Sequence, residues 1–334
     1  MKSRIILLLS VFVYFIFIFC LGKTAFTLIH ASLGGGVSFS DLKQVLYHGL
    51  PLDMSMSGYL TIIPALIIIC SIWIKREIIT KISNVYFAII VFIIALVTVA
   101  DIVVYPYWGF HFDSTVFLYL QKPKETFASA TLPQLGLGLL ATIVVAFVYY
   151  VVYGIVIKRL FASQATPKHG RMTHTFVVLL LLTGMLFLPI RGGVTVSTMN
   201  IGRVYFSDNM YLNHAAINPV FNLMYSFFKS ERFGSQYQFL DKQEAEDIFA
   251  QLNSQPAADS IPQLLTTNRP NVILFILESF SSDAASDSTI APNMHRLMHE
   301  GIYFDKFYAN SFRTDRGLVS ILSGYPAHPT VAIM

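Results

Sequence analysis

Two residues late in the sequence, Glu278 and Thr314, have side chains and surroundings that could do chemistry. Glu278 directly follows the apolar run Asn271–Leu277, which has the length and the β-branched and aromatic content of a strand buried on both faces. Ligands of open α/β sheets bind outside the carboxyl ends of the strands, so a site residue is expected there. Thr314 lies 36 positions later in Arg313-Thr-Asp-Arg-Gly317, a polar turn with a hydroxyl between two guanidinium groups. A carboxylate can bind a hard cation, and an activated hydroxyl can attack a substrate.

The segment between these residues has the pattern of a helix followed by a second strand. Ala291-Pro-Asn-Met-His-Arg-Leu297 places a proline in a first helical turn, and Gly301 lies where a left-handed residue would end that helix. Residues 302–308 alternate well enough for a strand. A strand, a helix and a second strand are consistent with the start of an α/β domain.

Composition places the rest of the chain in a membrane. Of the 334 residues, 54% are hydrophobic and 13% are charged, whereas charged residues make up about a quarter of an ordinary soluble domain. Residues 1–190 hold 13 Lys and Arg against 6 Asp and Glu, and residues 191–334 hold 10 against 13. The basic half is also the apolar half, so its charge indicates membrane topology rather than nucleic-acid binding.

Five apolar stretches approach or exceed the roughly 17–25 residues that cross a bilayer. They lie at about residues 5–21, 59–74, 85–104, 132–157 and 175–190. The first has no clear small-residue cleavage site, so we expect a membrane anchor rather than a signal peptide. If the N-terminus is cytoplasmic, the cytoplasmic segments hold nine Lys and Arg and the outer connections hold four. The positive-inside rule then places everything after residue 190 outside the cytoplasm.

The predicted spans themselves carry little chemistry. Asp101 is the only ionisable residue that we place well within an apolar stretch, and charges inside membranes are functional candidates by default. It precedes the aromatic run Tyr105-Pro-Tyr-Trp108, so an interfacial carboxylate is the simpler interpretation, with ion or proton transport as the alternative. Cys20 and Cys70 both lie in apolar spans and indicate no disulfide framework.

The sequence changes character after the fifth span. Apolar residues between Ile217 and Phe228 recur at helical spacing, which predicts an amphipathic helix that lies in the outer interface or packs on the soluble domain. Asp241 and Glu244 have the spacing of a helix cap, with the helix running to about Leu252. We therefore expect a five-span domain at 1–190, juxtamembrane and linker helices at 191–270, and an outer domain from 271 to 334.

Three motifs in the last part of the chain resemble a known family. They are Asn-Val-Ile-Leu-Phe-Ile-Leu-Glu-Ser from residue 271, Ala-Pro-Asn-x-x-x-Leu-x-x-x-Gly-x-x-Phe from residue 291, and Thr-x-x-x-x-x-x-x-Leu-Ser-Gly-Tyr-Pro from residue 314. In this order they are similar to the start of the catalytic domain of the sulfatase/alkaline-phosphatase superfamily. Five spans before an outer domain resemble its lipoteichoic acid synthase and phosphoglycerol transferase branch. The resemblance implies an α-helical membrane domain followed by the first part of an α/β sulfatase-like sandwich.

The resemblance also implies roles for individual residues. Glu278 would bind a divalent metal, Mn²⁺ in the first place with Zn²⁺ or Mg²⁺ as alternatives, and Thr314 would be both a metal ligand and the nucleophile. Arg313 and Arg316 would offset the charge of a substrate phosphate. The implied reaction transfers a phosphoglycerol or similar headgroup from a phospholipid to a glycan or glycolipid, through a phosphothreonine, at the outer face of a bacterial cytoplasmic membrane.

Departures from the relatives decide between the branches of the superfamily. Sulfatases carry Cys or Ser where Thr314 stands and Arg where Leu318 stands, so sulfate ester hydrolysis is the lesser alternative. Phosphoethanolamine transferases share the Glu and the Thr but usually carry disulfides in the outer domain, and no cysteine follows Cys70 here. His295 and His299 have a spacing that suits a metal, but a surface pair is favoured.

The part of the chain after residue 270 is short for this kind of domain. Residues 271–334 amount to about half the usual domain size, and the family's Asp and His metal ligands come from later sequence. We therefore expect a fragment that is inactive on its own. A membrane module that serves only assembly is the non-enzymatic alternative.

Overall fold

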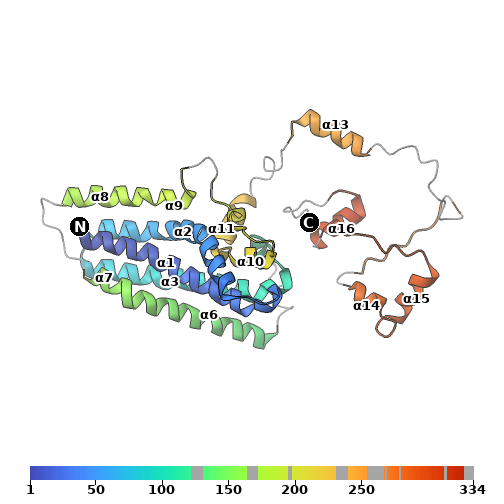
Figure 1. The fold of residues 1–334 in the computed structure, drawn as a ribbon, viewed down its shortest axis with the longest axis horizontal. Coiled ribbons are helices and arrows are strands. Elements are labelled where there is room, and N and C mark those ends of the chain that lie inside the picture. Colours follow the sequence, from blue (N-terminus) through green and yellow to red (C-terminus); the bar gives the residue numbers. More distant parts are fainter. Residues whose placement is uncertain are drawn as a thin grey trace. The chain divides into compact units, whose positions relative to one another are not determined.

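The computed structural model describes residues 1–121, 131–163, 172–194, 198–230, 240–253, 267, 269–277, 280–311 and 314–326. The chain divides into two compact units, Met1–Lys229 and Ser230–Met334. Every regular element in the described ranges is a helix (Figure 1).

The first unit is a bundle of long apolar helices. Five of those in the described residues are long and apolar enough to cross a membrane, which makes the chain a multi-pass membrane protein. The first three are α1 (Lys2–Ile29), α2 (Phe39–Cys70) and α3 (Arg76–Trp108). The fourth is one continuous helix made of α6 (Leu132–Tyr153), the π-helical turn η2 (Gly154–Lys158) and α7 (Arg159–Ala162). The fifth consists of α8 (Met172–Met185) and α9 (Phe187–Arg191).

Two of the spans begin or end far from the predicted positions. The prediction ended the first span near residue 21, but α1 continues to Ile29, and it began the second near residue 59, but α2 starts at Phe39. The start of α2 is a capping box, in which the Ser38 Oγ accepts from the Asp41 N–H at 3.1 Å and the Asp41 carboxylate accepts from the Ser38 N–H at 2.9 Å. Hydropathy alone misplaces these ends because each helix carries a buried charge in its polar part.

Aromatic rings and tyrosine hydroxyls hold the bundle together. Phe87 from α3 stacks on Phe15 from α1 and on Tyr153 from α6, with ring centroids 5.7 Å and 4.2 Å apart. The Tyr14 hydroxyl of α1 donates to the Tyr149 carbonyl of α6 at 2.9 Å. In a bundle without a strong hydrophobic driving force between helices, such packing and hydrogen bonds fix the arrangement of the spans.

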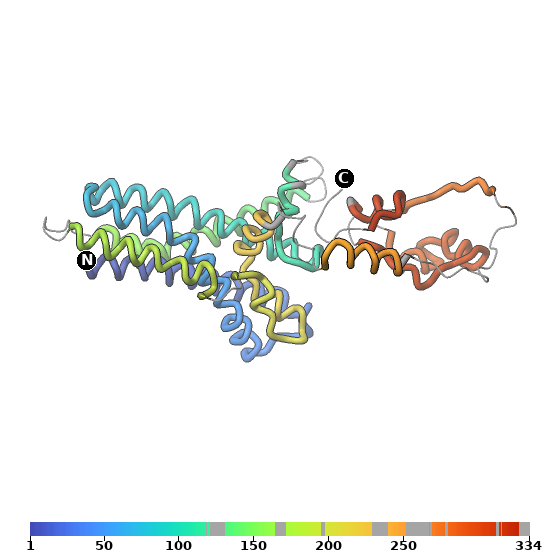
Figure 2. The backbone as a smooth tube through the Cα atoms, turned by 90° about the horizontal axis from the view of Figure 1, so that it is seen from above, coloured from blue at the N-terminus to red at the C-terminus, as the bar shows by residue number. Residues whose placement is uncertain are grey.

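Short elements cover the end of the bundle where α1 and α3 end and α2 and α6 begin, called the distal end below (Figure 2). They are η1 (Ala31–Gly34), α4 (Thr115–Gln121), η4 (Ile201–Val204), α10 (Met210–Ala215) and α11 (Pro219–Ser230). Ala216, Ile217, Val220 and Phe221 are buried in the same apolar core as the spans. The predicted amphipathic segment therefore packs on the helix bundle, because its apolar face covers the helix ends.

The second unit contains four short helices in its described part: α13 (Lys242–Asn253), α14 (Ser282–Ser286), α15 (Pro292–Glu300) and α16 (Thr314–Ser323). The predicted cap of α13 is confirmed, since an Asp241 carboxylate oxygen accepts from the Glu244 N–H at 3.0 Å. α15 starts with Pro292 as predicted, but Gly301 has φ −108°, so the prediction of a left-handed residue was wrong.

Neither predicted strand forms. Residues 271–277 and 302–308 have no regular structure, and Val272 and Phe275 are 79% and 81% exposed. A strand needs neighbours that accept its backbone hydrogen bonds, and the described residues contain no second strand to pair with either segment. The described part of the second unit is therefore all-helical, without an α/β sandwich.

Candidate functional site

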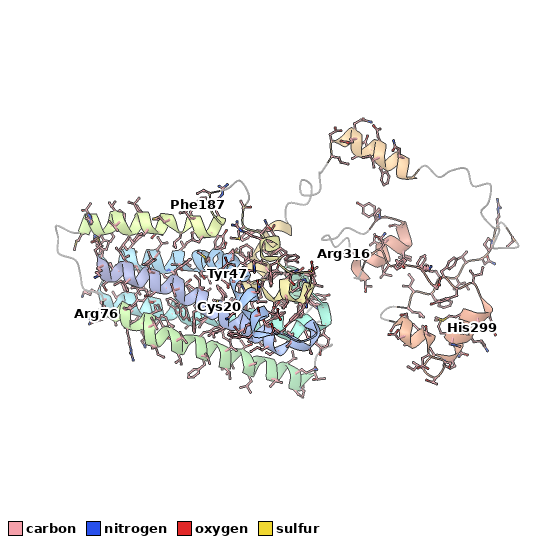
Figure 3. The ribbon with its side chains drawn as sticks, viewed as in Figure 1. Cys20, Tyr47, Arg76, Phe187, His299 and Arg316 are labelled. Atoms are coloured by element: carbon pink, nitrogen blue, oxygen red, sulfur yellow. The ribbon has the colours of Figure 1, made fainter. Side chains whose placement is uncertain are left out.

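The residues predicted to form the site fall partly within the described chain. Glu278 and Arg313 lie outside the described residues. Thr314 is the first residue of α16 and its side chain is exposed, whereas the side chain of Arg316, in the same helical turn, is only 6% exposed (Figure 3). Both residues therefore lie in the first turn of α16, but side chains two positions apart on a helix point to different sides.

The start of α16 is a favourable place for an anionic group. The first backbone N–H groups of a helix have no partner within the helix, and the helix dipole adds partial positive charge at this end. Phosphate groups bind at such positions in many proteins. Thr314 is thus located where a phosphoryl group could meet its hydroxyl.

The described residues alone do not form a metal site. No group of three or more His, Cys, Asp or Glu side chains that could hold a metal ion occurs among them. His295 and His299 lie side by side on α15 with ring centroids 4.7 Å apart, and the described chain brings no third ligand to them. Metal binding by Glu278 and Thr314 stays a prediction.

Unlike the described part of the second unit, the first unit holds a dense cluster of buried polar groups at its distal end. Lys23 of α1 and Asp53 of α2 form an ion pair of 2.9 Å with side chains 1% and 0% exposed. The Lys23 ammonium also donates to the Gly49 carbonyl at 2.8 Å, and the Asn218 amide donates to the second Asp53 oxygen at 2.8 Å. These contacts join α1 to α2, and Asn218 fastens the residue before α11 to α2.

A second buried pair, Asp101 and His111, lies in the same region. The His111 Nδ1 is 2.8 Å from an Asp101 carboxylate oxygen, and the His111 Nε2 is 2.7 Å from the His214 carbonyl. Both partners offer acceptor oxygens, an arrangement that favours the imidazolium form of His111, in which both ring nitrogens donate. The Phe112 N–H donates to the other Asp101 oxygen at 2.7 Å. Asp101 is therefore a buried, paired residue near the end of α3, and its predicted position at the membrane interface stays a prediction.

The two ion pairs face a common small cavity. It has a volume of about 10 Å³ and is lined by both pairs' cations, by Asp101 and by the Thr98 side chain, among apolar residues. This is room for about one water molecule, and the lining offers the polar partners that a buried water needs. We call Lys23, Asp53, Asp101, His111, His214 and Asn218 the distal polar cluster.

Histidines of the cluster have shifted pKa values. Burial alone would lower the pKa of His111, but the Asp101 carboxylate and the hydrogen bonds to Asp101 and to the His214 carbonyl raise it above its ordinary value of 6.5. Burial and the repulsion by His111 lower the pKa of His214, against the opposite effect of Asp101. Neutral His214 has its Nδ1 2.8 Å from the Tyr105 hydroxyl. Burial also raises the pKa of Tyr211 to about 12.

Sequence reasoning missed most of this cluster. It ended the first span near residue 21, before Lys23, did not consider Asp53, and treated Asp101 as the only charge well within an apolar stretch. A signal was present, since Lys23 and Asp53 lie within helices that continue well past the apolar runs. Two opposite charges near the facing ends of neighbouring spans are candidates for a pair.

Comparison with known proteins adds no identification. No family model matches the sequence, and no solved structure matches the chain.

Proposed function

We propose that the protein is a membrane-anchored, metal-dependent transferase that moves a phosphoglycerol or related phosphoalcohol headgroup from a phospholipid to an outer-face glycan or glycolipid. The observation that carries the proposal is the position of Thr314, whose exposed side chain opens the ten-residue helix α16. The order of the three sequence motifs adds Glu278 as a metal ligand. An α/β sandwich and an extracytoplasmic location in a bacterial cytoplasmic membrane are parts of the same proposal.

In the proposed reaction, the Thr314 hydroxyl attacks the phosphorus of the donor lipid. Its proton passes to solvent, the phosphorus–oxygen bond to diacylglycerol breaks, and diacylglycerol leaves with a proton. A hydroxyl of the acceptor then attacks the phosphothreonine, which forms the product and restores Thr314. Arg313 and Arg316 offset the phosphate charge. A divalent cation bound by Glu278 and Thr314 would lower the pKa of the threonine hydroxyl.

Mass spectrometry tests this proposal on the protein in its native membrane. After incubation with phosphatidylglycerol and Mn²⁺, we expect a phosphoglycerol adduct on the peptide that contains Thr314. Phosphatidylethanolamine in a parallel reaction distinguishes a phosphoethanolamine transferase, and a sulfate ester distinguishes a sulfatase. Absence of any adduct at Thr314, or headgroup transfer that survives Thr314→Ala, would refute the mechanism.

Control variants separate the nucleophile from the fold. Thr314→Ser keeps a hydroxyl at the start of α16 and should retain transfer. Thr289→Ala removes an exposed threonine from a turn of the same unit, where its hydroxyl donates to Asp287 at 2.6 Å, and should leave transfer unchanged. Loss of transfer in Thr289→Ala would indicate sensitivity to local folding rather than a role for Thr314.

Ion or proton transport is a second candidate, and the two buried ion pairs of the distal polar cluster favour it. In reconstituted vesicles, Asp101→Asn would then abolish ion or proton flux, while Thr314→Ala would leave flux intact. A wild-type chain that carries no flux rules out this candidate.

A further inference from the structure

Prolines inside the long helices α2 and α3 leave backbone carbonyls without their usual partners. Pro64 of α2 lacks the N–H group that would bond the Leu60 carbonyl, and Pro106 of α3 lacks the one that would bond the Ile102 carbonyl. We call residues 60–64 the α2 proline turn and residues 102–106 the α3 proline turn. A carbonyl inside a membrane helix that loses its backbone donor needs another one, because burying an unbonded polar group is costly.

In each proline turn, a side chain from a neighbouring element supplies the missing donor. The Tyr86 hydroxyl of α3 donates to the Leu60 carbonyl at 2.6 Å. The Nε2 atom of His30, the residue after α1, lies 2.8 Å from the Ile102 carbonyl oxygen, and Nε2 must donate because a carbonyl oxygen only accepts. Both side chains therefore bond the carbonyl four positions before a proline, which is the one that the proline sets free.

Ring packing keeps both donors in position. The His30 side chain is 7% exposed, and its ring centroid lies 5.1 Å from that of Phe26 and 5.7 Å from that of Tyr105. Tyr86 packs against the apolar core, with its ring edge-to-face to Phe87 at a centroid distance of 5.3 Å. The two hydrogen bonds are therefore built into the contacts between the helices.

The α3 proline turn also lies beside the distal polar cluster. Asp101 directly precedes this turn, and Tyr105 within it has its hydroxyl 2.8 Å from the His214 Nδ1. The chain reverses after α3 at Gly109, where φ is 70°, and this reversal brings His111 back to the Asp101 carboxylate. A change in the bend of α3 would therefore shift partners of the cluster.

We propose that the two proline turns are hinges of the first unit, and that Tyr86 and His30 hold each hinge at one bend by donating to the carbonyl that its proline leaves free. A helix bends over a wider range at a proline without such a donor, because one bond of its backbone ladder is missing there. The bend of α2 thus depends on α3, and the bend of α3 depends on the end of α1. This device does not depend on Thr314 or on any transfer reaction.

Double-mutant cycles in detergent test whether Tyr86 acts through Pro64. Tyr86→Phe removes only the hydroxyl and should lower the midpoint of thermal unfolding by about 2–4 °C, as expected for one lost hydrogen bond. Pro64→Ala restores a backbone donor for the Leu60 carbonyl, so Tyr86→Phe should cost clearly less in that background. Pro51→Ala is the matched control in the same helix. It restores the donor for the Tyr47 carbonyl instead, and should leave the cost of Tyr86→Phe unchanged.

The same cycle applies to the α3 proline turn. His30→Phe keeps a ring but removes the donor, and it should lower the midpoint by a similar amount in the native background and by less in Pro106→Ala. His30→Gln keeps an N–H donor close to the place of Nε2 and should retain most of the native midpoint. This rescue separates the hydrogen bond from the volume of the side chain.

Electron paramagnetic resonance measures the bending itself on the whole chain. With Cys20→Ala in place, spin labels on the native Cys70 and on Tyr47→Cys occupy exposed positions on the two sides of Pro64. The labels lie about 35 Å apart by helical rise. Tyr86→Phe should widen the distribution of label distances about twofold, because α2 then lacks the donor at its hinge. Tyr86→Phe/Pro64→Ala should restore the native width.

Three results would overturn the proposal. Equal costs of Tyr86→Phe in the native and the Pro64→Ala backgrounds mean that the hydroxyl contributes independently of the proline. An unchanged width in Tyr86→Phe means that α2 does not bend there, and this readout decides the matter even if Pro64→Ala does not fold. Pro51 lies between the same labels in every variant and cannot cause a difference. A midpoint for His30→Gln as low as that for His30→Phe means that ring packing, not the hydrogen bond, holds the α3 proline turn.

Discussion

At the scale of single residues, the ion pair of Lys23 and Asp53 illustrates how buried charges depend on each other. Neither side chain reaches solvent, and Asp53 has one further donor in the Asn218 amide. Removing one member of such a pair leaves a buried charge without compensation, which costs about 3–5 kcal/mol. We expect Lys23→Met to lower the unfolding midpoint in detergent strongly, as measured by thermal denaturation.

The matched variant for this prediction is the double substitution Lys23→Met/Asp53→Asn. It removes both charges and keeps an acceptor for the Asn218 amide, so it should recover a large part of the stability lost in Lys23→Met. Equal destabilisation by the single and the double variant would mean that the pair contributes through packing and not through charge.

The histidines of the distal polar cluster predict a stability optimum in pH. The raised pKa of His111 gives a contribution that is fully present below pH 6.5 and is lost as the pH rises through the folded value. The lowered pKa of His214 gives a contribution that is present above pH 6.5 and is lost as the pH falls toward its folded value. Thermal unfolding of the chain should therefore show a maximum midpoint near pH 6.5.

Single substitutions test which histidine causes the decline in midpoint on each side of this pH profile. His111→Gln should remove the decline in midpoint on the alkaline side, and His214→Gln should reduce the decline on the acidic side. A profile that stays the same in both variants would attribute the optimum to other groups.

Residue-scale reasoning from the sequence reached only part of the site. The residue types and spacing of Glu278 and Thr314 can be read from the chain, but pairing in space cannot. Lys23, Asp53 and Asn218 are far apart in sequence, and only the packing of α1, α2 and α11 brings them together. His111 and His214 similarly meet across a bundle end that no local pattern describes.

At the scale of elements, the contact between α2 and the turn after α10 depends on a missing side chain. A Cβ atom at Gly49 would lie 2.6 Å from the Ala216 carbonyl oxygen and would also meet the Lys23 ammonium. Because backbone atoms cannot yield easily, we expect Gly49→Ala to cost about 1–3 kcal/mol by overpacking. Thermal unfolding in detergent measures this loss.

The helix α6 offers the matched control. A Cβ atom at Gly136 would meet nothing within 4 Å, and alanine is the better helix former. Gly136→Ala should leave the midpoint unchanged or raise it slightly. Equal losses in Gly49→Ala and Gly136→Ala would mean that helix flexibility rather than close contact explains the effect.

The elements also show which signals in the sequence are strong. Apolar length found all five candidate spans, and the Asp241 cap and Pro292 located two later helices correctly. Strand prediction failed because residues 271–277 have the composition of a buried strand, but a strand forms only with partners that a local pattern does not supply. The predicted end of α1 and the predicted start of α2 were wrong because a helix tolerates a buried charge when that charge is paired.

At the scale of the whole molecule, the two units differ in how much they bury. The apolar core of the described chain belongs to the first unit, whereas Ala285 and Arg316 are the buried residues in the described part of the second. The helices α13 to α16 have 5 to 12 residues, and isolated helices shorter than about 12–15 residues are marginal in water. Stability should therefore be concentrated in the first unit.

Amide hydrogen exchange followed by mass spectrometry measures this difference on the 334-residue chain in detergent. Peptides from α13 and α15 should exchange on the order of seconds, while those from the core of α1 and α3 should stay protected on the order of hours. The apolar residues 272–277, which are 40–81% exposed, should exchange as fast as α15 because they lack strand partners. Slow exchange there would show that further protein covers this segment, as burial on both faces of a sheet requires.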